Sequence, residues 1–339
     1  QVALGCVFIS GIIFFIISAL PIREWIVNAI PKSLKMAIAA GIGLFLALIA
    51  LENAKIVVAH PVTLVTHGDL ASWPVLMAVL GFALIVALEH RKVIGGVIIG
   101  ILAVTVISIL AGKQKFGGVF DMPPSVAPVF LQMDLAGALS VGLVTVVFAF
   151  LFVDLFDNTG TLIALAHRGG FMRPDGTVPR LHRALMADSG AAMIGAAIGT
   201  STTTSYIESA AGVAEGGRTG FASVVTGILF LLMIFISPAA QLVPYQASAP
   251  VLIVVGFLMF TLVKDIPVSD VEDGLPALLA MILMPLTYSI TVGIGAGFIT
   301  WTFIKVARGK TSEIHPLMWL VSIAFVVYFA QNWISALLG

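Results

Sequence analysis

Two aspartates lie three residues apart inside a long apolar run of this sequence. Asp154 and Asp157 occur within the apolar run 136–166, and residues at this spacing share one face of a helix. Two carboxylates this close repel each other, so one of the pair should be able to hold a proton. Ionisable groups at membrane depth mark a pathway or a site by default. We therefore expect the pair to serve proton coupling, against the alternatives of a solvated helix end or of a structural pair that caps a helix break at Gly160.

Six consecutive Ser and Thr residues occupy 200–205, directly after a stretch of small residues. This composition forms helix poorly and strand fairly, and an extended segment at membrane depth must pair with protein or line a wet cavity. We expect a half-helix to start near Ser205 with Glu208 in its first turn, as in the discontinuous helices of secondary transporters. The alternative is an outside loop with a capping Ser. It is disfavoured because the next apolar run, 206–216, is too short to cross a bilayer alone.

Other polar positions leave more than one interpretation open. Asp188 precedes the stretch of small residues, and it either joins the carboxylate network or caps a helix. A further group of acids beside Lys264 is typical of a solvated cytoplasmic edge: Asp265, Asp270, Glu272 and Asp273. The six His residues do not pair at metal-ligand spacing and there is no phosphate loop, so we expect no metal, no cofactor and no ATP-driven pump.

The composition places these polar groups in a membrane protein. Of the 339 residues, 60% are hydrophobic and 10% are charged, and the mean hydropathy is +1.12. A soluble domain has about 25% charged residues. The formal net charge is zero, which leaves no electrostatic case for nucleic acid. The single cysteine, Cys6, allows no intrachain disulfide. Soluble enzymes, nucleic-acid binders and disordered chains are therefore excluded as classes.

The elements that must position the polar groups are apolar runs that recur along the whole chain. A helix needs about 20 mostly apolar residues to cross a bilayer. The predicted spans are 2–20, 36–51, 74–89, 93–111, 136–166, 184–199, 206–216, 220–243, 249–263, 272–286, 288–304 and 318–337. The last run either spans or is re-entrant. Because the chain opens at Gln1 in an apolar run without a signal peptide, we expect that further segments precede it.

The basic residues predict the orientation of these spans. When the first span ends in the cytoplasm and 206–216 counts as a crossing, fourteen of the seventeen Lys and Arg residues fall in inside loops. This asymmetry is the positive-inside pattern. It predicts a multi-pass protein of the cell (inner or plasma) membrane.

Several motifs, taken in order, resemble those of the xanthine/uracil permease superfamily and within it the AzgA-like branch of adenine, guanine and hypoxanthine permeases. The similarity covers essentially the whole chain. Asn158 departs from the pattern, because the family commonly has Thr at this position. The motifs that carry the resemblance are 30–35, 40–45, 52–54, 154–161, 202–208 and 284–290.

The resemblance implies an all-α polytopic membrane protein with inverted repeats, discontinuous helices, and a core and a gate domain that move as in an elevator. The first three of the family's fourteen segments would be missing from this chain. The implied domains are 1–20 as a remnant of the core, 21–135 as the first half of the gate, 136–219 as the core with the substrate motifs, 220–243 as the last core helix and 244–339 as the second half of the gate.

The resemblance also implies a site for a nucleobase. The implied substrate-binding residues are Asp157, Glu208, Thr159, Thr204, Ser205 and Tyr206. Proton coupling would involve Asp154, Asp157, Asp188 and Glu208. A carboxylate suits a purine because the purine ring N–H and exocyclic amine are hydrogen-bond donors.

The leading hypothesis is thus a proton-coupled purine nucleobase symporter that works by alternating access. Its partners would be a purine, a proton, the lipid bilayer and a second copy in a homodimer. The same fold could instead carry another nucleobase or an anion, although carboxylates at both breaks would repel an anion. An intramembrane enzyme with Asp154 and Asp157 as a catalytic dyad is a weaker alternative, because spacing alone does not split the proton affinities of two acids.

Overall fold

The computed structural model describes residues 1–19, 30–93, 95–115, 118, 120–123, 125–139, 141–174, 176–206 and 208–338. Within its helices, the side chains of 141–146, 148–149, 152–153, 155–157 and 331–338 lie outside this description. The chain divides into two compact units. Unit 1 comprises Gln1–Ile42, Ser125–Ser209 and Met259–Gly339, and unit 2 comprises Gly43–Pro124 and Ala210–Leu258.

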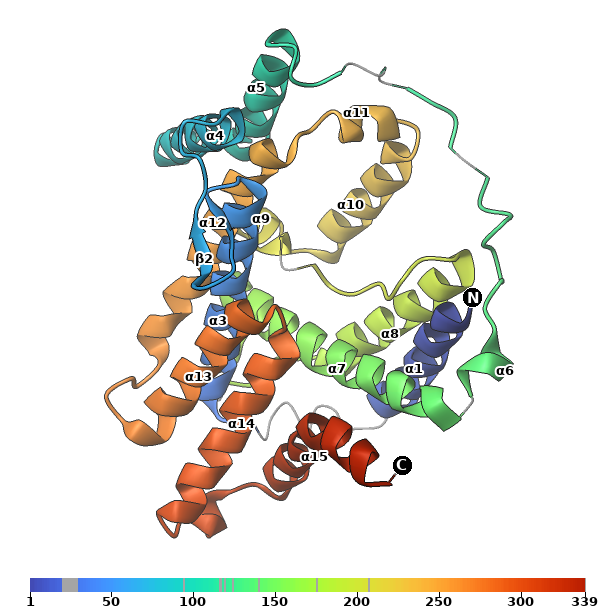
Figure 1. The fold of residues 1–339 in the computed structure, drawn as a ribbon, viewed down its shortest axis with the longest axis vertical. Helices are drawn as coiled ribbons and strands as arrows, with labels where there is room; N and C mark the ends of the chain where they lie inside the picture. The colour runs from blue at the N-terminus through green and yellow to red at the C-terminus, as the bar shows by residue number, and fades with distance from the viewer. Residues whose placement is uncertain are drawn as a thin grey trace. The chain divides into compact units, whose positions relative to one another are not determined.

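Unit 1 is built from helices that pack on one another in two groups. In the first group, α1 (Val2–Ala19) packs against α7 (Val141–Gly169), α8 (Leu181–Ile198) and the short α6 (Leu135–Ala138) (Figure 1). In the second, α14 (Ile290–Ala307) packs against α13 (Val271–Thr287) and α15 (Pro316–Leu338). The N-terminal part of α3 (Lys32–Asn53) also belongs to unit 1. Two short 3-10 helices, η1 (Thr261–Asp265) and η2 (Thr311–Glu313), lie before α13 and after α14.

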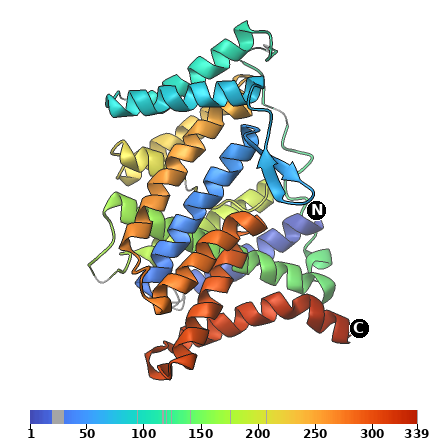
Figure 2. The same cartoon turned by 60° about the vertical axis from the view of Figure 1, so that its left-hand side comes forward.

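Unit 2 contains the C-terminal part of α3 and the helices that follow it. Here α4 (Trp73–His90) packs against α5 (Gly96–Leu110), as two views show (Figures 1 and 2). The later elements are α9 (Ser209–Ala214), which begins at the boundary of the units, α10 (Gly220–Met233), α11 (Ser237–Gln241) and α12 (Tyr245–Phe260).

One antiparallel hairpin interrupts the helical pattern, and the sequence did not predict it. Strand β1 (Val57–His60) pairs with β2 (Leu64–His67), and His60 lies opposite Leu64. The His60 Nδ1 atom accepts hydrogen bonds from the backbone N–H groups of Val62 at 3.3 Å and Thr63 at 3.2 Å. Strands of four residues are too short to show a clear alternation of apolar and polar residues. The side chain that stabilises the turn was therefore not recognisable from the pattern.

The predicted spans and the observed helices agree closely, and the all-α polytopic fold class is confirmed. Within the described residues, five helices are long and apolar enough to cross a membrane: α1, α3, α4, α12 with η1, and α14. Two predicted spans are divided into separate helices, 136–166 into α6 and α7 and 220–243 into α10 and α11.

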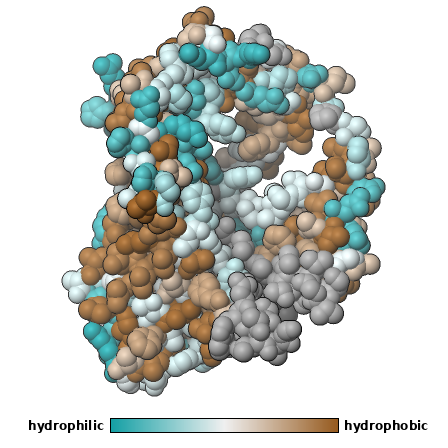
Figure 3. Space-filling view, viewed as in Figure 1, coloured by the Kyte–Doolittle hydropathy of each residue, from teal (hydrophilic) through white to brown (hydrophobic). Residues whose placement is uncertain are grey.

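Large apolar side chains remain on the surface of these helices. Figure 3 shows them gathered over the α13 and α14 side of unit 1, where Leu286 is 62% exposed and Phe303 is 70% exposed. Exposed apolar patches of this kind mark contact with a membrane or a partner in a protein. Together with the spanning helices, they agree with a protein that is immersed in a bilayer.

Candidate functional site

Helix α7 presents a buried polar face at its centre. Asp154, Asn158 and Thr161 lie at positions i, i+4 and i+7, and they are 2%, 1% and 6% exposed. The helix approaches α3 closely at Gly160, where an added Cβ would lie 2.8 Å from the Cγ2 atom of Ile38. Because such a contact leaves no room for a side chain, glycine allows α7 to pack here. The polar face is therefore held inside unit 1.

Asp154 binds the Ser/Thr segment that follows α8. The hydroxyl of Thr202 lies 3.1 Å from Oδ1 and 2.9 Å from Oδ2 of Asp154, and it donates to this carboxylate. Hydrogen bonds to an ionised acceptor are stronger than those between neutral groups. Asp154, one of the two aspartates of the predicted dyad, thus binds a residue that lies 48 positions later in the chain.

Asp188 binds the same segment from a second helix. Its Oδ1 atom accepts a hydrogen bond from the backbone N–H of Ser205 at 3.0 Å, and the Ser205 hydroxyl lies 3.4 Å away. Asp188 lies well inside α8, which begins at Leu181, and it is 6% exposed. The alternative that Asp188 caps a helix start is therefore wrong, because the helix already extends seven residues before it.

The Ser/Thr segment turns back along the end of α8. Gly199 has a φ of +101°, a left-handed conformation that favours glycine, and it ends the helix. An added Cβ on Gly195 would lie 2.5 Å from the Thr203 hydroxyl, so the segment passes very close to the helix that precedes it. Residues 200–206 contain no regular helix or strand. The segment is non-helical, as predicted, and two carboxylates from α7 and α8 hold it in place.

The half-helix after the break starts later than expected. Helix α9 begins at Ser209 rather than near Ser205, and Glu208 precedes it as an exposed residue. The prediction that Glu208 lies in the first turn is therefore wrong. Asp188 of α8 binds the N–H of Ser205, and a turn in which the N–H of Ser209 donates to the carbonyl of Tyr206 at 3.2 Å precedes α9.

The remaining predicted site residues have different environments. Thr204 and Ser205 are half-buried, and Tyr206 is 65% exposed. Asp157 lies in α7, but its side chain is outside the described residues. Asp154 and Asp188 thus both bind the Ser/Thr segment, whereas the side chains of Tyr206 and Glu208 are exposed.

Two buried polar side chains of α7, those of Asn158 and Thr159, have no hydrogen-bond partner among the described residues. Neither amide atom of Asn158 has a hydrogen-bond partner among the described residues, and the same is true of the Thr159 hydroxyl. Asn158 is 1% exposed and Thr159 is 4% exposed. A buried polar group without a partner costs about 1–3 kcal/mol. These atoms are therefore suited to bind a water molecule or a polar ligand.

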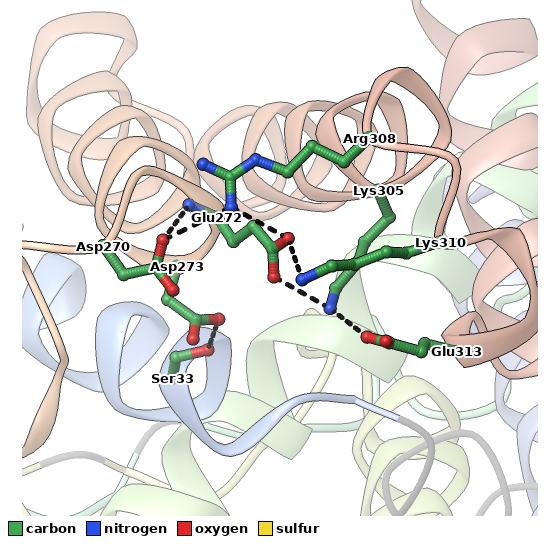
Figure 4. Close-up of polar contacts among 8 residues, drawn as sticks. All are labelled: Ser33, Asp270, Glu272, Asp273, Lys305, Arg308, Lys310 and Glu313. Atoms are coloured by element: carbon green, nitrogen blue, oxygen red, sulfur yellow. Dashed lines mark hydrogen bonds and ion pairs between the residues drawn. The ribbon is translucent and has the colours of Figure 1, made fainter.

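A second polar cluster lies at the start of α13 and the end of α14 (Figure 4). Glu272 is 6% exposed and forms ion pairs with Lys305 at 3.0 Å, Arg308 at 2.9 Å and Lys310 at 2.6 Å. Lys305 also binds Glu313 at 2.6 Å. The expectation of a solvated edge is therefore wrong for Glu272. Sequence reasoning missed the signal, which is an acid in the first turn of α13 with one base in the last turn of α14 and two more directly after it.

The same end of α13 is tied to the start of α3. The hydroxyl of Ser33 donates to Oδ1 of Asp273 at 2.6 Å, as Figure 4 also shows. Because Asp273 follows Glu272 directly, this bond and the ion pairs join three helix ends within unit 1. The cluster has a structural role, because its acids and bases pair with one another and hold these helix ends together.

Comparisons with known proteins agree with this membrane architecture. The model of the xanthine/uracil permease family, described as a permease family, matches residues 1–332. A putative permease of Methanocaldococcus jannaschii is 47% identical over 97% of this chain and 76% of its own length. The guanine/hypoxanthine permease PbuG of Bacillus subtilis is 46% identical over 97% of this chain and 75% of its own length. The adenine permease AdeP of Escherichia coli is 39% identical over 96% and 74%.

A solved structure supports the fold. The transmembrane domain of the cyanobacterial bicarbonate transporter BicA superposes with a TM-score of 0.60 and 14% identity, covering 87% of this chain and 76% of that one. At this identity the likeness concerns the fold alone. The named relatives are permeases and not enzymes, which argues against the catalytic-dyad alternative. The chain therefore belongs to the xanthine/uracil permease family of multi-pass membrane transport proteins.

Proposed function

We propose that the protein is a proton-coupled permease that takes up purine nucleobases by alternating access between its core and gate domains. The relatives named as guanine/hypoxanthine and adenine permeases support a purine as the substrate. The observation that carries most weight is in α7, where the buried side chains of Asn158, one turn after Asp154, and of Thr159 have no hydrogen-bond partner among the described residues. A neutral heterocycle with donors and acceptors on its edge could satisfy such atoms.

In this proposal, the carboxylates have two kinds of task. Asp157 and Glu208 accept hydrogen bonds from the purine, while Thr159, Thr204, Ser205 and Tyr206 complete the site. Asp154 and Asp188 are positioning residues that hold the broken segment, because each already binds it through Thr202 or Ser205. Their assignment to proton coupling, together with Asp157 and Glu208, is part of the same proposal.

Uptake measurements test the proposal directly. Cells that lack their own nucleobase permeases would express the full-length protein and be given radiolabelled adenine, guanine, hypoxanthine or uracil. We expect saturable purine uptake that an ionophore abolishes by dissipating the proton gradient. Uptake that is unchanged by the ionophore would refute proton coupling, and uptake of uracil alone would refute the purine assignment.

Two variants test the site residues. Asp157→Asn and Glu208→Gln keep the size of each side chain and remove its charge, so both should abolish uptake while the protein still reaches the membrane. Glu215→Gln is the matched control, because Glu215 is also exposed near α9 and has no proposed role. Wild-type uptake in either site variant would overturn its assignment.

A further inference from the structure

An apolar groove lies between α4 and α12 in unit 2 and shares no residue with the site described above. Its volume is about 490 Å³. Six apolar side chains line it together with two polar ones at one end: Phe82, Val86, Ile253, Val254, Phe257, Leu258, Glu89 and His90. The lining residues of α4 recur at i, i+4, i+7 and i+8, so one face of this helix forms one wall. Phe257 remains 63% exposed in the opposite wall.

The groove runs along the helices toward the C-terminal end of α4. The two helices touch at Gly81, where an added Cβ would lie 3.2 Å from the Cγ atom of Pro250. Beyond this contact the groove extends from Phe82 to His90, which corresponds to about 12 Å at the helical rise of 1.5 Å per residue. Both helices are long and apolar enough to cross a membrane. An apolar groove of this length along two such helices fits a hydrocarbon chain of the bilayer.

The polar end of the groove has a small positive charge. Glu89 and His90 line it, and Arg91 and Lys92 follow directly in the chain; all four are exposed. With His90 neutral, the two basic residues and the single acid sum to one positive charge. Basic residues at a membrane surface attract anionic lipid headgroups. A headgroup with one negative charge matches this end better than a zwitterionic or multiply charged one.

We propose that the groove binds one acyl chain of an anionic phospholipid with a singly charged headgroup, such as a phosphatidylglycerol. The acyl chain lies against Phe82, Val86 and Phe257, and the phosphate lies near Arg91 and Lys92. The glycerol hydroxyls of the headgroup are hydrogen-bond donors, which suit the carboxylate of Glu89. The proposal is independent of the transported substrate, since the groove lies within unit 2 and includes none of the residues proposed to bind the purine.

Lipid binding to the purified full-length protein tests the headgroup. Native mass spectrometry in detergent would compare added phosphatidylglycerol with phosphatidylcholine of the same acyl chains. We expect wild-type protein to prefer phosphatidylglycerol about tenfold or more, and each basic residue removed to lower its affinity about fivefold. Arg91→Gln with Lys92→Gln should therefore bind both lipids equally. The control pair Lys113→Gln with Lys115→Gln removes two basic residues elsewhere in unit 2 and should keep the preference.

A groove-filling variant tests the acyl chain. Val86→Trp places a large ring in the groove and should weaken binding of both lipids, whereas Val106→Trp on the exposed face of α5 should not, because Val106 is 50% exposed and outside the groove. Equal binding of both lipids by the wild-type protein would overturn the proposal. So would a Val86→Trp variant that leaves lipid binding unchanged. A Val86→Trp variant that instead separates a dimer into monomers would show that a second copy occupies the groove.

Discussion

The hydrogen bond from Ser205 to Asp188 permits a quantitative test of how the broken segment is held. The Ser205 N–H donates to Asp188 Oδ1 at 3.0 Å, and Asp188 is 6% exposed. A hydrogen bond to a charged group contributes about 1.5–3 kcal/mol. Asp188→Ala removes the acceptor and should therefore destabilise the closed segment by about 2 kcal/mol. At about 1.4 kcal/mol per factor of ten, the segment would open roughly 30-fold more often.

The variant Asp188→Asn separates the geometric role of this residue from its charge. Its amide keeps a carbonyl oxygen that can accept the same hydrogen bond, but a neutral acceptor forms a bond about half as strong. The loss of about 1 kcal/mol corresponds to a roughly fivefold increase in opening. Asn should thus lie between the wild-type protein and Ala.

Hydrogen–deuterium exchange measures this opening directly. The exchange rate of the Ser205 amide follows the population of the open segment when closing is fast. We expect the peptide that contains 200–206 to exchange faster in the order wild type, Asp188→Asn, Asp188→Ala, while peptides from α13 and α14 remain unchanged. If both variants exchange at the wild-type rate, or if Asn exchanges as fast as Ala, the bond does not hold the segment and the reasoning is wrong.

Three further variants or probes test the packing of unit 1. Gly160→Ala should lower stability by about 1–3 kcal/mol through overpacking against α3, whereas Gly190→Ala, where an added Cβ meets nothing within 4 Å, should not lower the unfolding temperature. Glu272→Gln should lower the unfolding temperature more than the exposed-site control Glu215→Gln, because it leaves three cations without their shared carboxylate; equal shifts would contradict this. The buried single thiol of Cys6 should react with a maleimide only on unfolding, and rapid labelling of the native protein would show that α1 is not packed as described.

The helices themselves were largely predictable, because membrane insertion imposes a local rule on the sequence. Each spanning helix must be a long apolar run, and such runs predicted α1, α4 and α13 to within a few residues. The non-helical Ser/Thr segment was also predictable, since its composition is poor for a helix. The short β1–β2 hairpin was not, because a strand of four residues carries too little periodicity.

The partners of the polar groups depend on contacts between distant parts of the chain. Sequence spacing placed Asp154 and Asp157 on one helix face, and it did not show that Asp154 also binds Thr202, 48 residues away. The sequence left open whether Asp188 caps a helix or joins the carboxylate network, and in the structure it binds Ser205, 17 residues away. The sequence predicted a solvated edge for Glu272, but three cations surround its carboxylate. A one-dimensional pattern cannot report such pairs, because helix packing decides which side chains meet.

The sequence by itself determined that this chain is a polytopic membrane protein in which a non-helical Ser/Thr segment interrupts the helices. Its 10% charged residues and recurrent apolar runs suffice for that conclusion, since the cost of burying polar groups in lipid acts on each segment separately. Only the tertiary structure decided which acids bind the Ser/Thr segment and where Glu208 lies. It also decided which polar atoms of α7 have no hydrogen-bond partner among the described residues. Those properties depend on how α3, α7 and α8 pack, and packing joins residues that no local pattern connects.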